Sequence, residues 1–349
     1  MTFSLQRFLI ILLLVLEGSI FAQKPKELFR SDDVLEMTLS FNEKEVFKDM
    51  EERNLHEASI QWTKADGSKG EIGLNVQVRG KTRAMKSTCK FPPLFLNFKG
   101  SETKNTPFKK QKKIKLVTHC KSSKSFKEYV KKEYLAYRLY NIVSPYGFKV
   151  RLCRITYRDS KNPDDEGVTQ YGFLIESIKD LAKRNEMKEY EGLLRNQESL
   201  DKNNLDRLTM FEYMIGNLDW SIPKRHNIKI MKGENNSLPV GVPYDFDYSG
   251  LVNTPYAVPP EGFDIESVKT RVFRGLCRDQ GYGATVDYFK GIQPEITKEI
   301  NTANYMDEKT ITEVLNYIQS FYKSIANPQT VTKEINEACW AKHKHIYEN

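Results

Sequence analysis

The chain lacks the short motifs by which several common enzyme classes are recognised. It contains no H-E-x-x-H motif of zinc proteases, no G-x-S-x-G nucleophile turn and no Walker phosphate-binding loop. Its cysteines form no C-x-x-C pair, which argues against a zinc site built on thiolates. His119 directly precedes Cys120, and adjacent residues on a strand point to opposite faces, so this pair predicts no cysteine nucleophile with a histidine base.

Long hydrophobic runs are scarce as well. Residues 8–16 form a run of nine strongly apolar residues, whereas a membrane-spanning helix needs about 18 or more. The run follows Arg7 and precedes small residues within 18–22, which is the order of a secretory signal peptide; a short buried helix is the alternative. We expect residues 1–22 to be a cleaved signal and the mature chain to be an exported, periplasmic or extracellular protein with no transmembrane segment.

Acidic residues are outnumbered by basic ones. The chain carries 54 Lys and Arg residues against 46 Asp and Glu residues, which gives a formal net charge of +8. This sign favours anionic partners such as nucleotides or an anionic surface polymer, and a solvated basic surface is the simpler explanation. Lysines crowd into residues 109–132 without the aromatic stacking pattern of a nucleic-acid module, so we expect no specific nucleic-acid partner.

Cysteine is rare but sufficient for cross-links. Five cysteines allow two disulfides and one remaining thiol in an oxidising compartment. Spacing alone does not give the connectivity. We expect a bridge between Cys89 and Cys120, because each flanks a strand-like run in the same half of the chain.

The hydrophobic pattern divides the chain into two parts. Its 349 residues exceed the size at which a single core usually stops growing. We expect a β-rich lobe with one major helix at residues 23–180 and a mainly helical lobe at 181–349. Apolar runs predict strands in the first lobe at 34–41, 57–64, 71–80, 94–99, 112–118, 150–158 and 169–177. The second lobe should contain a helix at 203–217, a short hairpin, and helices from 265 onward.

A strong amphipathic helix is predicted between residues 125 and 143. Its apolar residues recur on one face at the helical period, and lysines occupy the opposite face. Glu133 lies in the middle of the apolar face. Such a break in a local pattern is typical of functional sites, although an acid at the edge of the stripe that reaches water would also produce it.

Four oxygen-bearing side chains follow the predicted helix at 203–217. Asp219 comes just after this helix, Asn227 stands at the entry to a strand, and Asp245 and Asp247 stand at the exit of the next strand. Phosphoryl transfer needs such a set, because one carboxylate must orient the accepting hydroxyl and hard oxygen ligands must hold Mg²⁺ against the nucleotide phosphates. Taken singly, each residue would equally suit a cap or a turn.

The order of these motifs resembles the CotH-type (spore coat protein H) atypical kinases over residues 70–250. The matching positions are Arg79-Gly80, Tyr171-Gly172 to Glu176, Asn217-Leu218-Asp219 with Asn227, and Asp245-Phe246-Asp247. The resemblance implies an α+β, two-lobed protein-kinase-like fold with a β-rich N-lobe and a helical C-lobe. It also implies that ATP and Mg²⁺ are the cofactors and that a hydroxyl of a protein or surface polymer accepts the phosphate.

The same resemblance assigns roles to individual residues. Asp219 would be the catalytic carboxylate, Asp245 the main metal ligand, and Asp247 and Asn227 the secondary ones. Lys115 would contact the phosphates and pair with Glu133. Because the Arg-Gly turn lacks further glycines, phosphate contacts would fall to Lys81, Arg83 or backbone N–H groups. The segment from Gly172 to Ser177, which contains Glu176, would be the hinge against which the adenine ring stacks, with backbone groups reading its edge.

Two other functions fit the same residues. The first is a non-catalytic kinase-like scaffold whose basic cleft binds an anionic partner of the cell envelope. The second is a basic structural protein in which Asp219, Asp245 and Lys115 lie far apart. The arrangement of these three side chains in space separates the alternatives.

Overall fold

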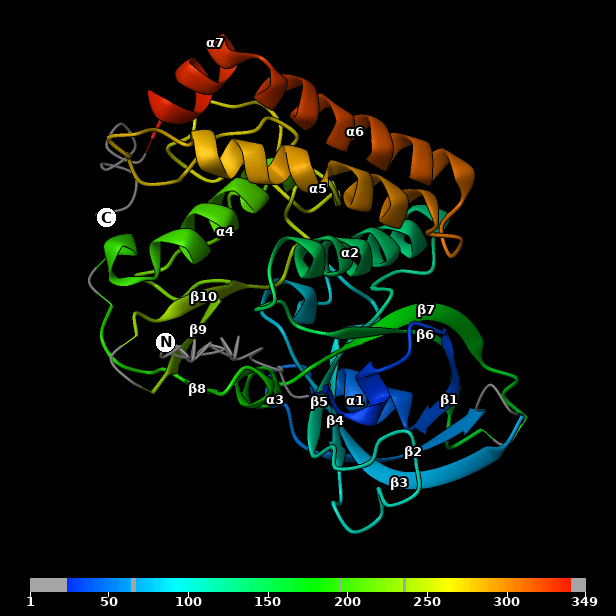
Figure 1. Ribbon diagram of the computed structural model, residues 1–349. Helices are drawn as coiled ribbons and strands as arrows, with labels where there is room; N and C mark the ends of the chain where they lie inside the picture. Colours follow the sequence, from blue (N-terminus) through cyan, green and yellow to red (C-terminus); the bar gives the residue numbers. More distant parts are fainter. Residues whose placement is uncertain (1–23, 64–66, 163, 195, 235–236, 340–349) are drawn as a thin grey trace, which may run out of the picture.

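The computed structural model describes residues 24–63, 67–162, 164–194, 196–234 and 237–339 (Figure 1). The predicted signal peptide at residues 1–22 lies outside these ranges. Within them, no helix combines the length and the apolar character that crossing a membrane requires.

Seven strands of the first half close into a barrel (Figure 1). Around the barrel their order is β1-β2-β3-β4-β5-β7-β6, and β6 returns to pair in parallel with β1. Alternate side chains of each strand point inward, as in β1, where Leu35, Met37, Leu39 and Phe41 are buried. The strands are β1 (Leu35–Phe41), β2 (His56–Thr63), β3 (Lys69–Val78), β4 (Leu94–Phe98), β5 (Lys113–Val117), β6 (Val150–Asp159) and β7 (Val168–Ile175).

The predicted protein-kinase-like fold is wrong. That fold requires a β-sheet N-lobe followed by a helical C-lobe, whereas the first seven strands form a closed barrel. The second half adds a three-stranded sheet in the order β10-β9-β8, made of β8 (Met187–Glu189), β9 (Ile228–Gly233) and β10 (Val240–Pro243). The strand positions were predictable from alternation, but the closure depends on the pairing of β1 with β6, which are distant in the chain.

Helix α2 (Lys124–Val143) lies between the barrel and the other long helices (Figure 1). This is the helix that the sequence predicts at 125–143. Its buried face shares one hydrophobic core with β7 and with α4 (Lys202–Ile215), α5 (Gly283–Asn301) and α6 (Glu308–Ala326). The helix therefore connects the barrel to the helical half through a continuous core, and its side chains can reach both.

The remaining helices are short. They are α1 (Glu43–Lys48), α3 (Ile178–Arg184) and α7 (Pro328–Val331), with 3-10 turns η1 (Glu27–Phe29), η2 (Thr82–Ala84) and η3 (Gln197–Ser199) and a single π turn η4 (Thr332–Asn336). Residues 265–277, which the sequence pattern predicts as helical, form turns, bends and irregular backbone instead. The predicted helix at 203–217 is present as α4, which ends at Gly216 in the left-handed conformation.

Two disulfides cross-link the described residues. The predicted bridge between Cys89 and Cys120 is confirmed, and a second joins Cys277 to Cys339. Cys153 is a buried free thiol inside the barrel core. The first bridge ties the segment that follows β3 to the end of β5, and this segment carries the residues described next.

Candidate functional site

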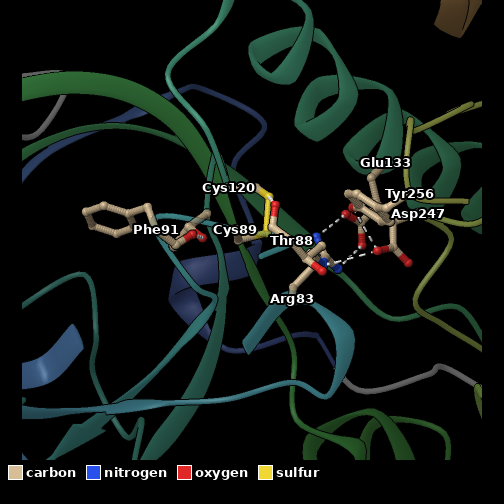
Figure 2. Close-up of a disulfide and its surroundings, with 9 residues drawn as sticks. Arg83, Thr88, Cys89, Phe91, Cys120, Glu133, Asp247 and Tyr256 are labelled. Carbon is tan, nitrogen blue, oxygen red and sulfur yellow. Dashed lines mark hydrogen bonds and ion pairs between the residues drawn. A yellow bond between two sulfur atoms is a disulfide. The ribbon is translucent and has the colours of Figure 1, made fainter. Parts of the chain in front are cut away.

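Arg83 binds three carboxylates from distant parts of the chain. Its Nη1 lies 2.9 Å from Glu133, its Nη2 2.9 Å from Asp245, and its Nε 3.1 Å from Asp247. Figure 2 shows the guanidinium between Glu133 and Asp247, beside the Cys89–Cys120 bridge. Arg83 thereby joins η2, α2 and the segment after β10 in one group of charges, which we call the Arg83 cluster: Arg83, Glu133, Asp245 and Asp247.

The segment after β10 is held in place by backbone hydrogen bonds. The N–H of Asp245 donates to the Tyr137 hydroxyl at 2.9 Å, and the N–H of Tyr244 donates to the Asn227 carbonyl at 3.0 Å. Asp245 itself has a positive φ of 65°, a conformation that is costly for a residue with a side chain and concentrates at functional sites. The Tyr256 hydroxyl donates to Asp247 at 3.0 Å and completes the support.

The three carboxylates of the cluster differ in their electrostatic state. Burial raises the pKa of Asp247 to about 8, against the opposing charge of Arg83, and burial also raises the pKa of Glu133. Burial would raise the pKa of Asp245 too, but the nearby charges of Arg83 and Arg79 lower it. The side chain of Asp245 is 33% exposed, against 2% for Glu133 and 7% for Asp247. Asp245 is therefore the member of the set whose ionised form is most favoured and whose side chain is most accessible, and the one best suited to bind a divalent cation.

Lys115 lies on the barrel side of the same region. Its ammonium is 4.5 Å from the centre of the Tyr244 ring, and burial lowers its pKa to about 8, with the charge of Arg79 adding to the shift and that of Asp245 opposing it. The expected ion pair with Glu133 does not form, because Glu133 binds Arg83. Lys115 nevertheless contacts Tyr244, the residue directly before Asp245.

Asp219 and its neighbours form a second polar group. Asp219 accepts hydrogen bonds through its two carboxylate oxygens, from His226 Nε2 at 2.7 Å and from the Asn227 amide at 3.0 Å. The Asn227 amide also donates to the Asp219 carbonyl at 2.8 Å, and the Asp219 N–H donates to the Asn217 side chain at 3.1 Å. These contacts fix the carboxylate while leaving 31% of the side chain exposed.

One hydrogen bond links the two groups: the N–H of Tyr244, the residue before Asp245, donates to the carbonyl of Asn227, whose amide binds Asp219. The hydrogen bond to Asp219 raises the pKa of His226, and the charge of Asp245 adds to this effect. The charge of Lys81 has the opposite effect and lowers the pKa of His226. Lys81 also lines a cavity of about 760 Å³ formed with residues 45–56 and 84–86. Lys115 and the Asp219 group thus both contact the segment that carries Asp245, through the ring and the backbone N–H of Tyr244.

Glu176 stands apart from this arrangement. Its side chain is buried and pairs with Arg184 at 3.1 Å, and it accepts a hydrogen bond from the Lys149 N–H at 3.1 Å. The Glu176 N–H donates to the Lys149 carbonyl at 2.9 Å. Both the side chain and the N–H that were expected to face an adenine are therefore engaged within the protein.

The metal site expected from the sequence takes a different form. Within the part of the chain that the structure describes, no three His, Cys, Asp or Glu side chains are grouped so as to hold a metal ion by themselves. Three of the predicted carboxylates surround the Arg83 guanidinium instead. A divalent cation would therefore have to use the accessible face of Asp245 together with oxygens of its ligand.

Sequence reasoning missed three residues that support the site. Tyr137 follows Glu133 by one helical turn, so the shared face of α2 was a usable signal. Tyr256 comes from an irregular segment and carried no signal. Arg79 was noted only as part of a turn, yet it is 8% exposed and its Nη1 has no hydrogen-bond partner in the described structure.

Comparisons with known proteins identify no family for this chain. No protein-family model matches it, and no curated protein matches it.

Proposed function

We propose that this protein is an exported phosphotransferase that binds ATP with Mg²⁺ and transfers the terminal phosphoryl group to a hydroxyl of a protein or surface polymer. One observation carries the proposal: a chain of contacts links Lys115, Asp245 and Asp219. Lys115 lies 4.5 Å from the Tyr244 ring, Tyr244 directly precedes Asp245 and donates its N–H to the Asn227 carbonyl, and the Asn227 amide donates to Asp219. A basic structural protein with no site would have no reason to collect these groups.

The residues present suit parts of this chemistry. Asp219 would accept or orient the proton of the attacking hydroxyl, and His226 and Asn227 would hold its carboxylate in position. Asp245 offers the ionised oxygen that Mg²⁺ prefers. Bound Mg²⁺ would neutralise charge on the transferred phosphoryl group. Lys115, which is buried beside Tyr244, would attract the phosphate oxygens.

The motif resemblance supports this chemistry independently of the fold. Arg79-Gly80, Asn217-Leu218-Asp219 and Asp245-Phe246-Asp247, which resemble segments of the CotH-type kinases, all contribute residues to this region or its borders. The barrel architecture means that the resemblance is one of site residues and not of the whole fold.

Export is supported by the cysteine chemistry. Four of the five cysteines are paired in two disulfides, which persist in oxidising compartments. Together with the predicted signal at residues 1–22, this favours a periplasmic or extracellular location.

The test is phosphate transfer from radiolabelled ATP by the purified protein in the presence of Mg²⁺. We predict that Asp219→Asn and Asp245→Asn each reduce transfer at least about 100-fold, as loss of a reacting or metal-binding carboxylate does. Asp264→Asn, which removes an exposed acid elsewhere, serves as the matched control and should transfer normally. Undiminished transfer by Asp219→Asn would remove the proposal.

A second function is favoured by the state of the Arg83 cluster. Arg83 already neutralises part of the charge of Glu133, Asp245 and Asp247, which is what a non-catalytic scaffold with a basic surface would contain. Such a scaffold would bind an anionic partner of the cell envelope without Mg²⁺. Transfer that is absent from the wild type, combined with Mg²⁺-independent binding of an anionic polymer, would favour this function.

A further inference from the structure

Arg79, which is buried, and Lys115, which is half-buried, are two cations that lack an ion-pair partner among the described residues. Arg79 is 8% exposed, its Nη1 has no hydrogen-bond partner, and its guanidinium packs only loosely over the Phe95 ring at 5.7 Å. Lys115 is half-buried by exposed area and contacts the Tyr244 ring. Placing unpaired cations in such surroundings is unfavourable unless an anion joins them.

The strand register places these two cations on the same face of the sheet, on either side of β4. In the barrel, Gln77 of β3 lies opposite Phe95 of β4, and Phe95 lies opposite Lys115 of β5. Arg79 follows Gln77 by two residues, so its side chain leaves the same face of the sheet. The Arg79 guanidinium lies 5.7 Å from the centre of the Phe95 ring, and Phe95 is the cross-strand neighbour of Lys115. Burial lowers the pKa of Lys115, and the charge of Arg79 adds to this effect.

Arg83 does not belong to this pair, although the sequence marked it as a phosphate contact. Its three nitrogens are all used: Nη1 and Nη2 donate to Glu133, Nη2 also donates to Asp245, and Nε pairs with Asp247. Arg79, four residues earlier, has free donors. The contacts therefore give the two arginines different roles. Arg83 holds the carboxylates together, and Arg79 is available to bind a ligand.

We propose that Arg79 and Lys115 together form the binding site for the phosphate chain of a nucleotide, with Arg79 as the cation that supplies directed hydrogen bonds. This proposal rests on the proposed function and names the residues that recognise its donor. The planar guanidinium suits bidentate contact with phosphate oxygens, and the ammonium adds a compact charge. Asp245 follows Tyr244, whose ring Lys115 contacts, so its carboxylate would be the residue to hold a cation shared with the phosphates.

Calorimetric titration of the purified protein with sodium tripolyphosphate, without Mg²⁺, tests the proposal. The wild type should bind one equivalent, and Arg79→Gln and Lys115→Gln should each weaken binding about tenfold or more, because each removes a charge-assisted contact. Lys69→Gln is the matched control, since Lys69 is an exposed residue at the opposite end of β3. It should bind as the wild type does.

Thermal unfolding without ligand provides a second readout. A buried cation without an ion-pair partner destabilises the ligand-free protein. Arg79→Gln should therefore unfold at the same temperature as the wild type or above it. A structural arginine would give a lower unfolding temperature together with the loss of binding. The proposal is overturned by unchanged tripolyphosphate binding in Arg79→Gln, by a lower unfolding temperature in that variant, or by absence of binding in the wild type.

ATP separates this proposal from the proposed function and from a polymer ligand. Arg79-dependent binding of ATP without any phosphate transfer would support the site and remove the phosphotransferase. Phosphate transfer with an unchanged KM for ATP in Arg79→Gln would support the phosphotransferase and overturn the role of Arg79 in the site. Binding of long-chain polyphosphate that ATP does not displace would overturn the assignment to a nucleotide.

Discussion

At the scale of single residues, the cluster depends on one guanidinium that satisfies three acids. Arg83 is 7% exposed, and no second cation contacts Glu133 in the described structure. Removing one partner of a buried ion pair costs far more than the pair itself contributes, because the remaining charges stay buried without compensation. The burial of Glu133 and Asp247 makes this the most sensitive position of the site.

Arg83→Met should lower the free energy of unfolding by about 3–5 kcal/mol. The reason is that Glu133 and Asp247 would remain buried without their cation. Urea denaturation at pH 7 measures the change. Arg154→Met is the control, because Arg154 is 54% exposed in its side chain and its contact with Glu36 is 3.6 Å long, so the cost should stay below about 1 kcal/mol. Equal effects of the two substitutions would contradict the role of Arg83.

At the scale of elements, the end of α4 determines where Asp219 lies. Gly216 terminates this helix with a φ of 64°, and the N–H of Asn217 donates to the Glu212 carbonyl at 2.8 Å. A Cβ added at Gly216 would meet the Tyr317 hydroxyl at 2.1 Å. Both the backbone conformation and the lack of space therefore require glycine three residues before the proposed catalytic carboxylate.

Gly216→Ala should destabilise the protein by about 1–3 kcal/mol, from left-handed backbone strain and the displacement of Tyr317. Gly291→Ala provides the matched control within α5, where an added Cβ meets nothing within 4 Å. That substitution should raise stability by about 0.5–1 kcal/mol, since glycine in a helix interior is unfavourable. Thermal denaturation measures both, and a neutral Gly216→Ala would show that α4 can end in another way.

At the scale of the whole molecule, the site exists because the barrel and the helical half are held together around it. The segment between β3 and β4 carries Arg79 and Arg83 and contains only the short turn η2. Figure 2 shows the Cys89–Cys120 bridge next to this segment, and the N–H groups of Lys90 and Phe91 both donate to the Cys120 carbonyl at 3.0 Å. The disulfide is thus one fixed point of the segment, and the contacts of Arg83 are another.

The double substitution Cys89→Ser with Cys120→Ser should cost about 2–4 kcal/mol of stability and should also loosen the segment that it fixes. Hydrogen exchange followed by mass spectrometry should show faster exchange across residues 79–93. The pair Cys277→Ser with Cys339→Ser, which opens the other bridge, should lower stability without affecting those amides. Unchanged exchange at 79–93 in the first variant would mean that the Arg83 contacts alone hold the segment.

Local features of this protein were determined by its sequence. Period-two alternation gave the positions of the barrel strands, the helical period gave α2, and Glu133 stood out because it interrupted the apolar face of that helix. The bridge between Cys89 and Cys120 could be anticipated because each cysteine lies beside a strand of the same half. These features depend on residues that are near one another in the chain.

Only the tertiary structure decided which distant residues meet. The parallel pairing of β1 with β6 turned an expected kinase-like sheet into a closed barrel, and alternation within each strand carries no information about that pairing. Glu133 pairs with Arg83 and not with Lys115. Lys115 and Arg79 therefore have no carboxylate ion-pair partner among the described residues. The pattern along the chain determines the face of the helix or strand on which a charged residue lies. Which residue it pairs with depends on the distances between segments in the folded protein, and the order of residues in the chain does not give those distances.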